Sequence, residues 1–393
     1  MYSTVYGVQT LVDRELAVSS GYKNADINSN EILGRKEKAV NQGSKMKVLC
    51  WYGKNFLAFV LAGFGVFLFL YFSSATISAE EGCIPVDGLE FICGVNQAED
   101  LLRMPNSNFV IASGRISDTE GQIYAIDKNS RIVSELFPRN VLEAKHDIEN
   151  FGDCPGSINA FQPHGISVRE MGQDAYWLYV VGHGYREAIE VFSLKINDDI
   201  PSLRWVGCIE APNQVERFNA VTVLPNNKIA VTHLPPAGSP NRGSGEVWEW
   251  SNNEGWEIVK GSQMPGPNGI VASSDGSTLF VAAYLGTSLK KLERQSSSQP
   301  IQVETIYSID NIRWSDEGEL LLAAHDRGCT PRGGCSNSSA THLLKASPID
   351  LEIETIRVIP VLDVFPVGTV IIDVGDEYWV GGIAGTDRIA IFR

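Results

Sequence analysis

FQPHGISVREMGQDAYWLYVVGHGYREAIEVF, residues 161–192, is the stretch that decides the fold of this chain. Its apolar runs HGISV, WLYVV and EVF are separated by polar turns, of which MGQDA is the clearest. Runs of Val, Ile, Tyr and Phe bounded by Gly and Asp are typical of β-strands. The stretch therefore predicts a meander of three strands, with His164 and His183 at strand boundaries.

The same meander recurs along the chain. Equivalents of its second strand are NFVIASG (108–114), YWLYVVGH (176–183), KIAVTHL (228–234), TLFVAAY (278–284), ELLLAAHD (319–326) and EYWVGGIAG (377–385). Each follows a polar turn and an apolar run, and each precedes a third apolar run. Six such units predict an all-β, six-bladed β-propeller, in which four-stranded blades surround a central channel. A large β-sandwich is the competing interpretation, but it does not explain the sixfold regularity.

The charge is distributed unevenly between the two ends of the chain. The formal net charge is −15, yet residues 1–54 carry eight Lys or Arg and only five Asp or Glu. The remainder is therefore strongly acidic. An acidic body argues against nucleic acid as a partner and is compatible with cation binding.

An uncharged apolar segment separates these two parts. Residues 55–79 contain no charged side chain, and lysines precede them while Glu80 and Glu81 follow. We predict a transmembrane helix or signal anchor at 55–73, a cytoplasmic polar tail at 1–54, and an exported catalytic propeller at 83–393, in the periplasm or outside the cell. The alternative is a signal peptide that starts at Met46 and is cleaved after Ala79, which would leave the propeller secreted.

The cysteines agree with export. Six of the seven lie in the predicted propeller, and an even number in an exported domain indicates disulfides. We predict the pairs Cys83–Cys93 and Cys329–Cys335, with unpaired buried thiols as the alternative. The spacings do not resemble a zinc site.

Polar residues open the innermost strand of five consecutive blades. They are Glu99 and Asp100, His164, Asn219, Asn268, and Asp310 and Asn311. Innermost strands line the channel of a propeller, so these side chains should converge. A ring of carboxylate and carboxamide oxygens suits Ca²⁺, whereas zinc or copper prefers His and Cys. We predict a calcium site formed by Glu99, Asn219, Asn268, Asp310 and Asn311. A polar, water-filled channel without metal is the alternative.

The segments FQPHGIS, YVVGHG-REAIEVF, FNAV, NGI-SSDG and DNIRWS-EG resemble the paraoxonase/arylesterase group, within the gluconolactonase and strictosidine-synthase-like propellers. The resemblance covers residues 83–393, with its motifs in family order. It implies a calcium-dependent lactonase with esterase activity, in which the five predicted ligands match those of the catalytic calcium. It also implies that His164 is the active-site histidine and His183 its dyad partner.

The chain departs from this family pattern in two places. The family's second, structural calcium uses the aspartate after Glu99, which is kept as Asp100, and an aspartate at the position of Ala220. That second site is therefore questionable here. The family's disulfide to the C-terminus has no partner, because the chain ends RIAIFR.

The expected chemistry is hydrolysis of a lactone or ester substrate, with Ca²⁺ polarising the carbonyl and His164 as the general base. His183 would orient His164 or relay protons, and Asp310 is a rival base. His233 and His325 also end second strands, so the position of His183 is not diagnostic by itself. No nucleophile elbow, P-loop or HExxH motif is present. A non-catalytic propeller that binds a ligand or a protein remains the alternative function, and the sequence indicates no oligomeric state.

Overall fold

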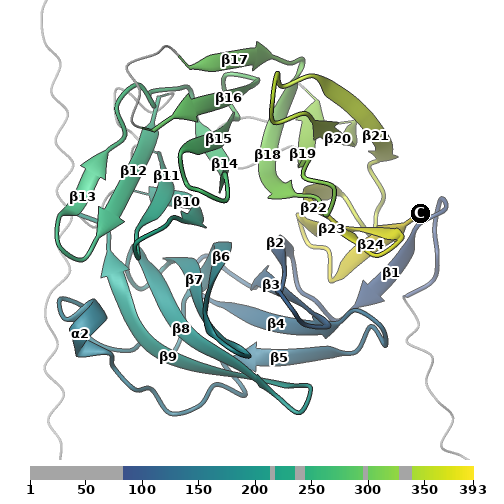
Figure 1. Ribbon diagram of the computed structural model, residues 1–393. Helices are drawn as coiled ribbons and strands as arrows, with labels where there is room; N and C mark the ends of the chain where they lie inside the picture. The colour runs from purple at the N-terminus through teal and green to yellow at the C-terminus, as the bar shows by residue number, and fades with distance from the viewer. Residues whose placement is uncertain (1–82, 213–216, 235–243, 295–299, 327–338) are drawn as a thin grey trace, which may run out of the picture. The chain divides into compact units, whose positions relative to one another are not determined.

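The computed structural model describes residues 83–212, 217–234, 244–294, 300–326 and 339–393. They form six four-stranded antiparallel sheets arranged as blades of a ring (Figure 1). The predicted six-bladed propeller is thereby confirmed. The predicted tail at 1–54 and membrane segment at 55–73 lie outside the described residues. Within the described ranges, no helix is long and apolar enough to cross a membrane.

Five blades are each built from four consecutive strands, in sequence order from the axis outward. The first two of these are β2 (Ala98–Arg103), β3 (Phe109–Arg115), β4 (Gly121–Asp127) and β5 (Val133–Phe137), and then β6 (Gln162–Gly172), β7 (Ala175–His183), β8 (Ala188–Asn197) and β9 (Ile200–Glu210). The third consists of β10 (Arg217–Val223), β11 (Ile229–Leu234), β12 (Glu246–Ser251) and β13 (Gly255–Ile258). The fourth and fifth are β14 (Pro267–Ala272), β15 (Thr278–Ala283), β16 (Ser288–Glu293) and β17 (Ile301–Glu304), and β18 (Tyr307–Trp314), β19 (Leu320–Asp326), β20 (Ala340–Ala346) and β21 (Ile353–Pro360).

The sixth blade joins the two ends of the described chain. It contains β22 (Val367–Val374), β23 (Glu377–Ile383) and β24 (Arg388–Phe392), and its outermost strand is β1 (Glu90–Cys93). β1 pairs antiparallel with β24, with Glu90 opposite Ile391 and Cys93 opposite Arg388 (Figure 1). Backbone hydrogen bonds between the first and last strands of the described chain, β1 and β24, therefore close the ring.

Two disulfides support the ring. Cys83 and Cys93 are bonded, as predicted, and tie the segment before β1 to its last residue. Cys154 and Cys208 form a second bond, between the loop after the short helix α2 (Ile148–Phe151) and strand β9. The sequence did not indicate this pairing. The predicted pair Cys329–Cys335 lies outside the described residues.

A β-bulge interrupts the innermost strand of every blade near its start. The pairing with the second strand shifts register between Ala98 and Asp100, Pro163 and Ile166, Phe218 and Val221, Pro267 and Ile270, Ile309 and Ile312, and Gly368 and Val370. Bulges redirect side chains and are common beside functional sites. The interrupted positions hold Glu99, His164, Asn219, Asn268, Asp310 with Asn311, and Thr369.

Glycines at two of these bulges let neighbouring blades approach closely. A Cβ at Gly165 would lie 2.6 Å from the Asn219 carbonyl oxygen, and one at Gly269 would lie 2.5 Å from the Asp310 carbonyl oxygen. Backbone cannot yield to such contacts as a flexible side chain can. The glycines of HGI and NGI are therefore required where innermost strands of adjacent blades meet.

Candidate metal centre at the propeller axis

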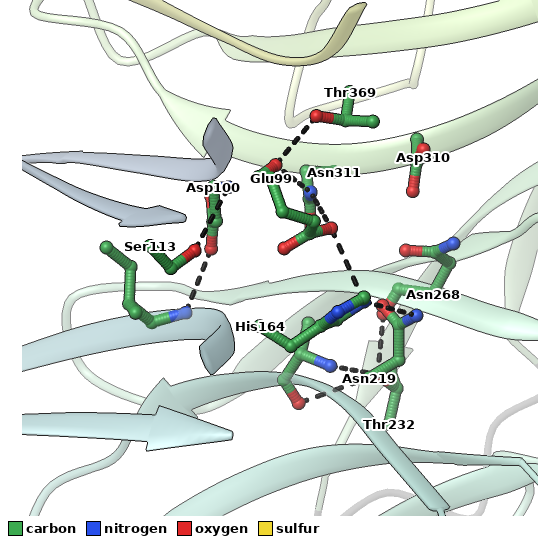
Figure 2. Close-up of polar contacts among 12 residues, drawn as sticks. Glu99, Asp100, Ser113, His164, Asn219, Thr232, Asn268, Asp310, Asn311 and Thr369 are labelled. Atoms are coloured by element: carbon green, nitrogen blue, oxygen red, sulfur yellow. Dashed lines mark hydrogen bonds and ion pairs between the residues drawn. The ribbon is translucent and has the colours of Figure 1, made fainter. Parts of the chain in front are cut away.

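The predicted site residues converge at the axis from five blades. Figure 2 shows Glu99, Asn219, Asn268, Asp310 and Asn311 with His164 around one space. Glu99, Asp310 and Asn311 are buried, with 4%, 7% and 2% of their surface exposed. Because each side chain leaves its strand at a bulge, the cluster depends on five local interruptions of regular pairing.

Three oxygens of this cluster are buried and lack a hydrogen-bond partner. They are Oε2 of Glu99, Oδ1 of Asn219 and Oδ1 of Asn268. A buried polar atom without a partner costs free energy of about 1–3 kcal/mol, so three in one place require an explanation. An oxygen-binding cation would satisfy all three at once. The donor set of carboxylates and neutral amide oxygens fits Ca²⁺.

Hydrogen bonds from neighbouring residues hold the candidate metal ligands Glu99 and Asn268 in place. The Nδ2 group of Asn311 donates to Oε1 of Glu99 at 2.9 Å, and the Thr369 hydroxyl donates to the Glu99 carbonyl oxygen at 2.7 Å. The Thr232 hydroxyl donates to the Asn268 carbonyl oxygen at 2.6 Å. Thr369 and Thr232 hold backbone at the bulges; sequence reasoning did not single out either as a site residue.

The electrostatics of the cluster favour a bound cation. Burial raises the pKa of Glu99 well above its usual range, and the negative charges of Asp100 and Asp310 raise it further. Burial also raises the pKa of Asp310 to about 7, against a hydrogen bond from the Asn268 side chain. Two buried carboxyl groups that repel each other ionise fully only when a positive charge compensates them.

The amide-rich composition of the cluster matters for recognising it. Among the described residues, no group of three or more His, Cys, Asp and Glu side chains is arranged to hold a metal ion. The candidate centre therefore depends on its carboxamides. Two of its three unpartnered oxygens belong to asparagine side chains.

His164 lies at the edge of this cluster. Its Nε2 atom is 3.4 Å from Oε1 of Glu99 and 3.2 Å from Nδ2 of Asn219 (Figure 2). The Asn219 amide thus directs its nitrogen to the imidazole and leaves its oxygen for a cation. Burial lowers the pKa of His164 well below its usual range, and the nearby His183 lowers it further. The ring is neutral at neutral pH, as a general base must be.

His183 packs directly against His164, and a carboxylate lies behind it. The two rings meet edge to face with centroids 5.2 Å apart. Nδ1 of His183 is 2.8 Å and 2.7 Å from the two carboxylate oxygens of Glu187. Sequence reasoning did not single out Glu187; the only signal was its place four residues after His183, in the loop to the next strand.

The other two second-strand histidines have different surroundings. Nδ1 of His233 is 3.0 Å from Oε1 of Glu246. Nε2 of His325 is 2.8 Å from the Gly368 carbonyl oxygen, so it carries the proton and leaves Nδ1 to accept from the Tyr284 hydroxyl at 3.3 Å. The His233 ring packs on Trp248 and the His325 ring on Tyr284, whereas the His183 ring packs on His164.

The second, structural calcium that the family pattern implies does not fit this chain. Arg313 forms a two-point ion pair with the buried carboxylate of Asp100, and the same guanidinium donates to the Ile166 carbonyl oxygen at 2.9 Å. The Ile166 backbone N–H donates to Asp100 at 2.9 Å. Ala220 offers no side-chain oxygen. A built-in cation therefore already neutralises Asp100.

A cavity of about 1060 Å³ lies at the other end of the innermost strands. Its lining comes from the last residues of all six, including Arg103, Arg169, Val223, Trp314 and Val374. Arg313, the ion-pair partner of Asp100, contributes to its wall, whereas none of the five candidate metal ligands lines it. The cavity and the candidate centre are thus distinct parts of the channel.

The fold and the axial cluster define a class: six-bladed β-propellers with polar side chains gathered at the channel. Among solved structures, the luciferin-regenerating enzyme has a TM-score of 0.52 at 10% identity, over 78% of this chain and 95% of that one. A candidate gluconolactonase has a TM-score of 0.49 at 12% identity, over 79% and 94%. Regucalcin from Agrobacterium tumefaciens, a calcium-binding protein, has a TM-score of 0.47 at 10% identity, over 77% and 91%.

At 10% identity, the likeness to the luciferin-regenerating enzyme shows a shared fold alone. No protein-family model matches the chain, and no curated protein matches it. The paraoxonase/arylesterase subtype stays a prediction.

Proposed function

We propose that this protein is a calcium-dependent hydrolase of lactones and aryl esters, with His164 as the general base. The observation that carries the proposal is the group of three unpartnered oxygens, on Glu99, Asn219 and Asn268, beside a neutral histidine. Metal-assisted hydrolysis requires a cation site and a proton acceptor close together. Here the Asn219 amide belongs to the candidate cation site and also contacts His164. The likeness in fold supports this only as a compatible scaffold.

The metal would be held by Glu99, Asn219, Asn268, Asp310 and Asn311. When bound, Ca²⁺ supplies a positive charge that polarises the substrate carbonyl and stabilises the oxyanion formed on attack. The chain's own residues do the rest. Asn219 keeps Nε2 of His164 at 3.2 Å from its amide, on the side of the ring that faces the cluster.

His164 moves the proton in this scheme. Its Nε2 exchanges the hydrogen bond it accepts from the Asn219 amide for one from the attacking water, and takes the water's proton as the water oxygen bonds to the carbonyl carbon. The bond from that carbon to the ester oxygen then breaks, and the proton passes from His164 to the leaving alkoxide or phenoxide. The products are a hydroxy acid from a lactone, or an acid and a phenol from an aryl ester. Asp310, held by Asn268 and directed at the cluster, is the rival base.

We also propose that the propeller works outside the reducing cytoplasm, membrane-anchored or secreted. Two disulfides within the described residues support this, because such bonds persist in oxidising compartments. The membrane contact proposed for 55–73 awaits a fractionation experiment. A propeller found in the soluble fraction with a chain starting near residue 80 would favour secretion.

The test is a substrate screen with purified protein, with calcium and with a calcium chelator. We expect hydrolysis of lactones and aryl esters that chelation abolishes and calcium restores. Asn268→Ala should lower kcat/KM at least about 100-fold and weaken calcium binding, because it removes a direct donor where outer-shell changes alone cost about 10–100-fold. Asn252→Ala, in an exposed turn of blade three, is the matched control.

Hydrolysis that persists in the chelated protein would overturn the calcium mechanism. Calcium binding without hydrolysis of any substrate would instead support a non-catalytic, ligand-binding propeller.

A further inference from the structure

Glu187 completes a three-residue arrangement that begins at the metal centre. It lies in the loop between β7 and β8, and both of its carboxylate oxygens approach Nδ1 of His183, at 2.8 Å and 2.7 Å. The His183 side chain is 4% exposed and the Glu187 side chain 14%. His183 in turn packs edge to face on His164. The three residues are therefore in successive contact, from Glu187 through His183 to His164.

Blade three holds Glu187 in this orientation. The Phe218 backbone N–H donates a hydrogen bond to its carboxylate, and Nε of Arg217 lies 3.8 Å from Oε1. Both groups belong to the start of β10, one and two residues before Asn219. The same strand thus carries a candidate metal ligand and the groups that orient Glu187.

The charged and titratable groups that face the pair come from three blades. They are His164 on β6, Arg217 on β10 and Arg115 on β3. Burial lowers the pKa of His183 to about 3 and raises that of Glu187 to about 7, while Arg217 lowers both. As pH rises through about 7, the Glu187 carboxyl group therefore loses its proton while His183 stays neutral.

The protonation state of Glu187 determines whether Nε2 of His183 can accept a hydrogen bond. With Glu187 ionised, Nδ1 of His183 carries the proton and donates to the carboxylate, which leaves Nε2 as an acceptor on the far edge of the ring. With Glu187 protonated, the carboxyl group donates to Nδ1, and Nε2 carries the proton instead. Only the first state can accept a hydrogen bond from an imidazolium at His164.

We propose that Glu187 is a positioning residue that sets the tautomer of His183, so that His183 stabilises the charge His164 gains on taking a proton from water. The inference rests on the proposed function for its kinetic part. Glu187 itself touches neither substrate nor metal.

Blade three provides a matched control. His233 and Glu246 form the same kind of pair as His183 and Glu187, at 3.0 Å, at the end of the second strand. His233 packs on Trp248 instead of on His164. A general loss of stability from removing such an acid should therefore be seen equally in Glu246→Gln.

The kinetic arm compares wild type with Glu187→Ala, Glu187→Gln and Glu246→Gln. We expect Glu187→Ala to lower kcat about 10–100-fold with KM and calcium affinity unchanged, as for other residues that orient a catalytic histidine. Glu187→Gln retains an acceptor for Nδ1–H and should recover part of that loss. In wild type kcat should rise as pH increases through about 7, where Glu187 ionises, and this step should be absent from Glu187→Gln.

The spectroscopic arm needs no activity. Nitrogen NMR of ¹⁵N-histidine-labelled protein reports which ring nitrogen of His183 is protonated, with His183→Gln as the assignment reference. We expect a proton on Nδ1 above pH 7 in wild type and a changed tautomer in Glu187→Ala. An unchanged tautomer would overturn the inference, as would equal losses of kcat in Glu187→Ala and Glu246→Gln. If wild type hydrolyses none of the substrates, the proposed function fails, and the tautomer measurement still decides the role of Glu187.

Discussion

At the scale of single residues, the Asn219 amide connects the two halves of the candidate chemistry. Its nitrogen is 3.2 Å from Nε2 of His164, and its oxygen is buried without a partner. A carboxamide can serve a cation and an imidazole at the same time because it presents an acceptor and a donor on opposite sides. A carboxylate at this position would offer the imidazole no donor.

His164→Gln should separate catalysis from metal binding. We expect kcat to fall about 100- to 10,000-fold, the usual contribution of a general base, with calcium affinity retained. Glutamine keeps a polar group beside Asn219 but cannot take the proton from water. Steady-state kinetics and calcium titration of the same sample check both statements. An undiminished kcat would move the base role to Asp310.

The residue types at the axis were predictable from the sequence because they recur at equivalent places in successive repeats. Glu187 was not, since its significance lies in a contact with the ring of His183 and in a hydrogen bond from the backbone of Phe218. In sequence, a carboxylate just after a strand cannot be distinguished from a solvated turn residue, because the distinction lies in its tertiary contacts.

At the scale of elements, the bulges in the innermost strands change the direction in which the site side chains point. In an uninterrupted strand, side chains alternate between the two faces of a blade, so a residue in register would point into the packing between blades. The bulge places Glu99, Asn268 and Asp310 toward the channel instead. The candidate donors come from four such bulges, each near the start of an innermost strand.

The Arg313–Asp100 ion pair ties three of these strands together, and breaking it should be costly. Arg313 lies on β18, Asp100 on β2, and Ile166, whose carbonyl oxygen Arg313 also binds, on β6. Arg313→Met leaves the Asp100 carboxylate buried without its cation. We expect a loss of about 3–5 kcal/mol in the free energy of unfolding, measured by chemical denaturation.

The double variant Asp100→Asn with Arg313→Met should recover much of this loss, because it removes both charges. Calcium titration should give one ion per chain in wild type. A stoichiometry of two would contradict the view that Arg313 stands in for a second cation.

At the scale of the whole molecule, closure of the ring depends on strand β1. β1 supplies the fourth strand of the blade that otherwise contains β22, β23 and β24, and its Ile92 belongs to the same buried cluster as Ile389 and Ile391. Without it, β24 would be an exposed edge strand with an apolar face. The last blade would then be joined to the first by fewer backbone hydrogen bonds, such as those that Val95 and Gln97 donate to Asp387 and Thr386.

Deletion of the chain through Cys93 should therefore lower Tm and promote aggregation, measured by thermal scanning and light scattering. The double variant Cys83→Ser and Cys93→Ser keeps the strand and removes the disulfide, so it separates the two contributions. We expect it to be milder, since the disulfide closes a loop of only 10 residues. An equal effect in both variants would assign closure to the disulfide instead of to the strand.

The sequence by itself determined the repeat, and with it the six blades, three strands of each and the polar residues that open them, but not that β1 completes the last blade. These follow from local patterns, in which apolar runs, turns and glycines recur at short range and specify each meander independently of the others.

Only the tertiary structure decided which of these residues meet and how. The bulges that aim Glu99 and Asp310 at the axis, the pairing of Glu187 with His183, and the ion pair of Arg313 with Asp100 all depend on the register between strands. Arg313 and Asp100 are 213 residues apart in sequence. Such contacts form because a closed ring brings the start of every innermost strand to one point, and no local pattern records that convergence.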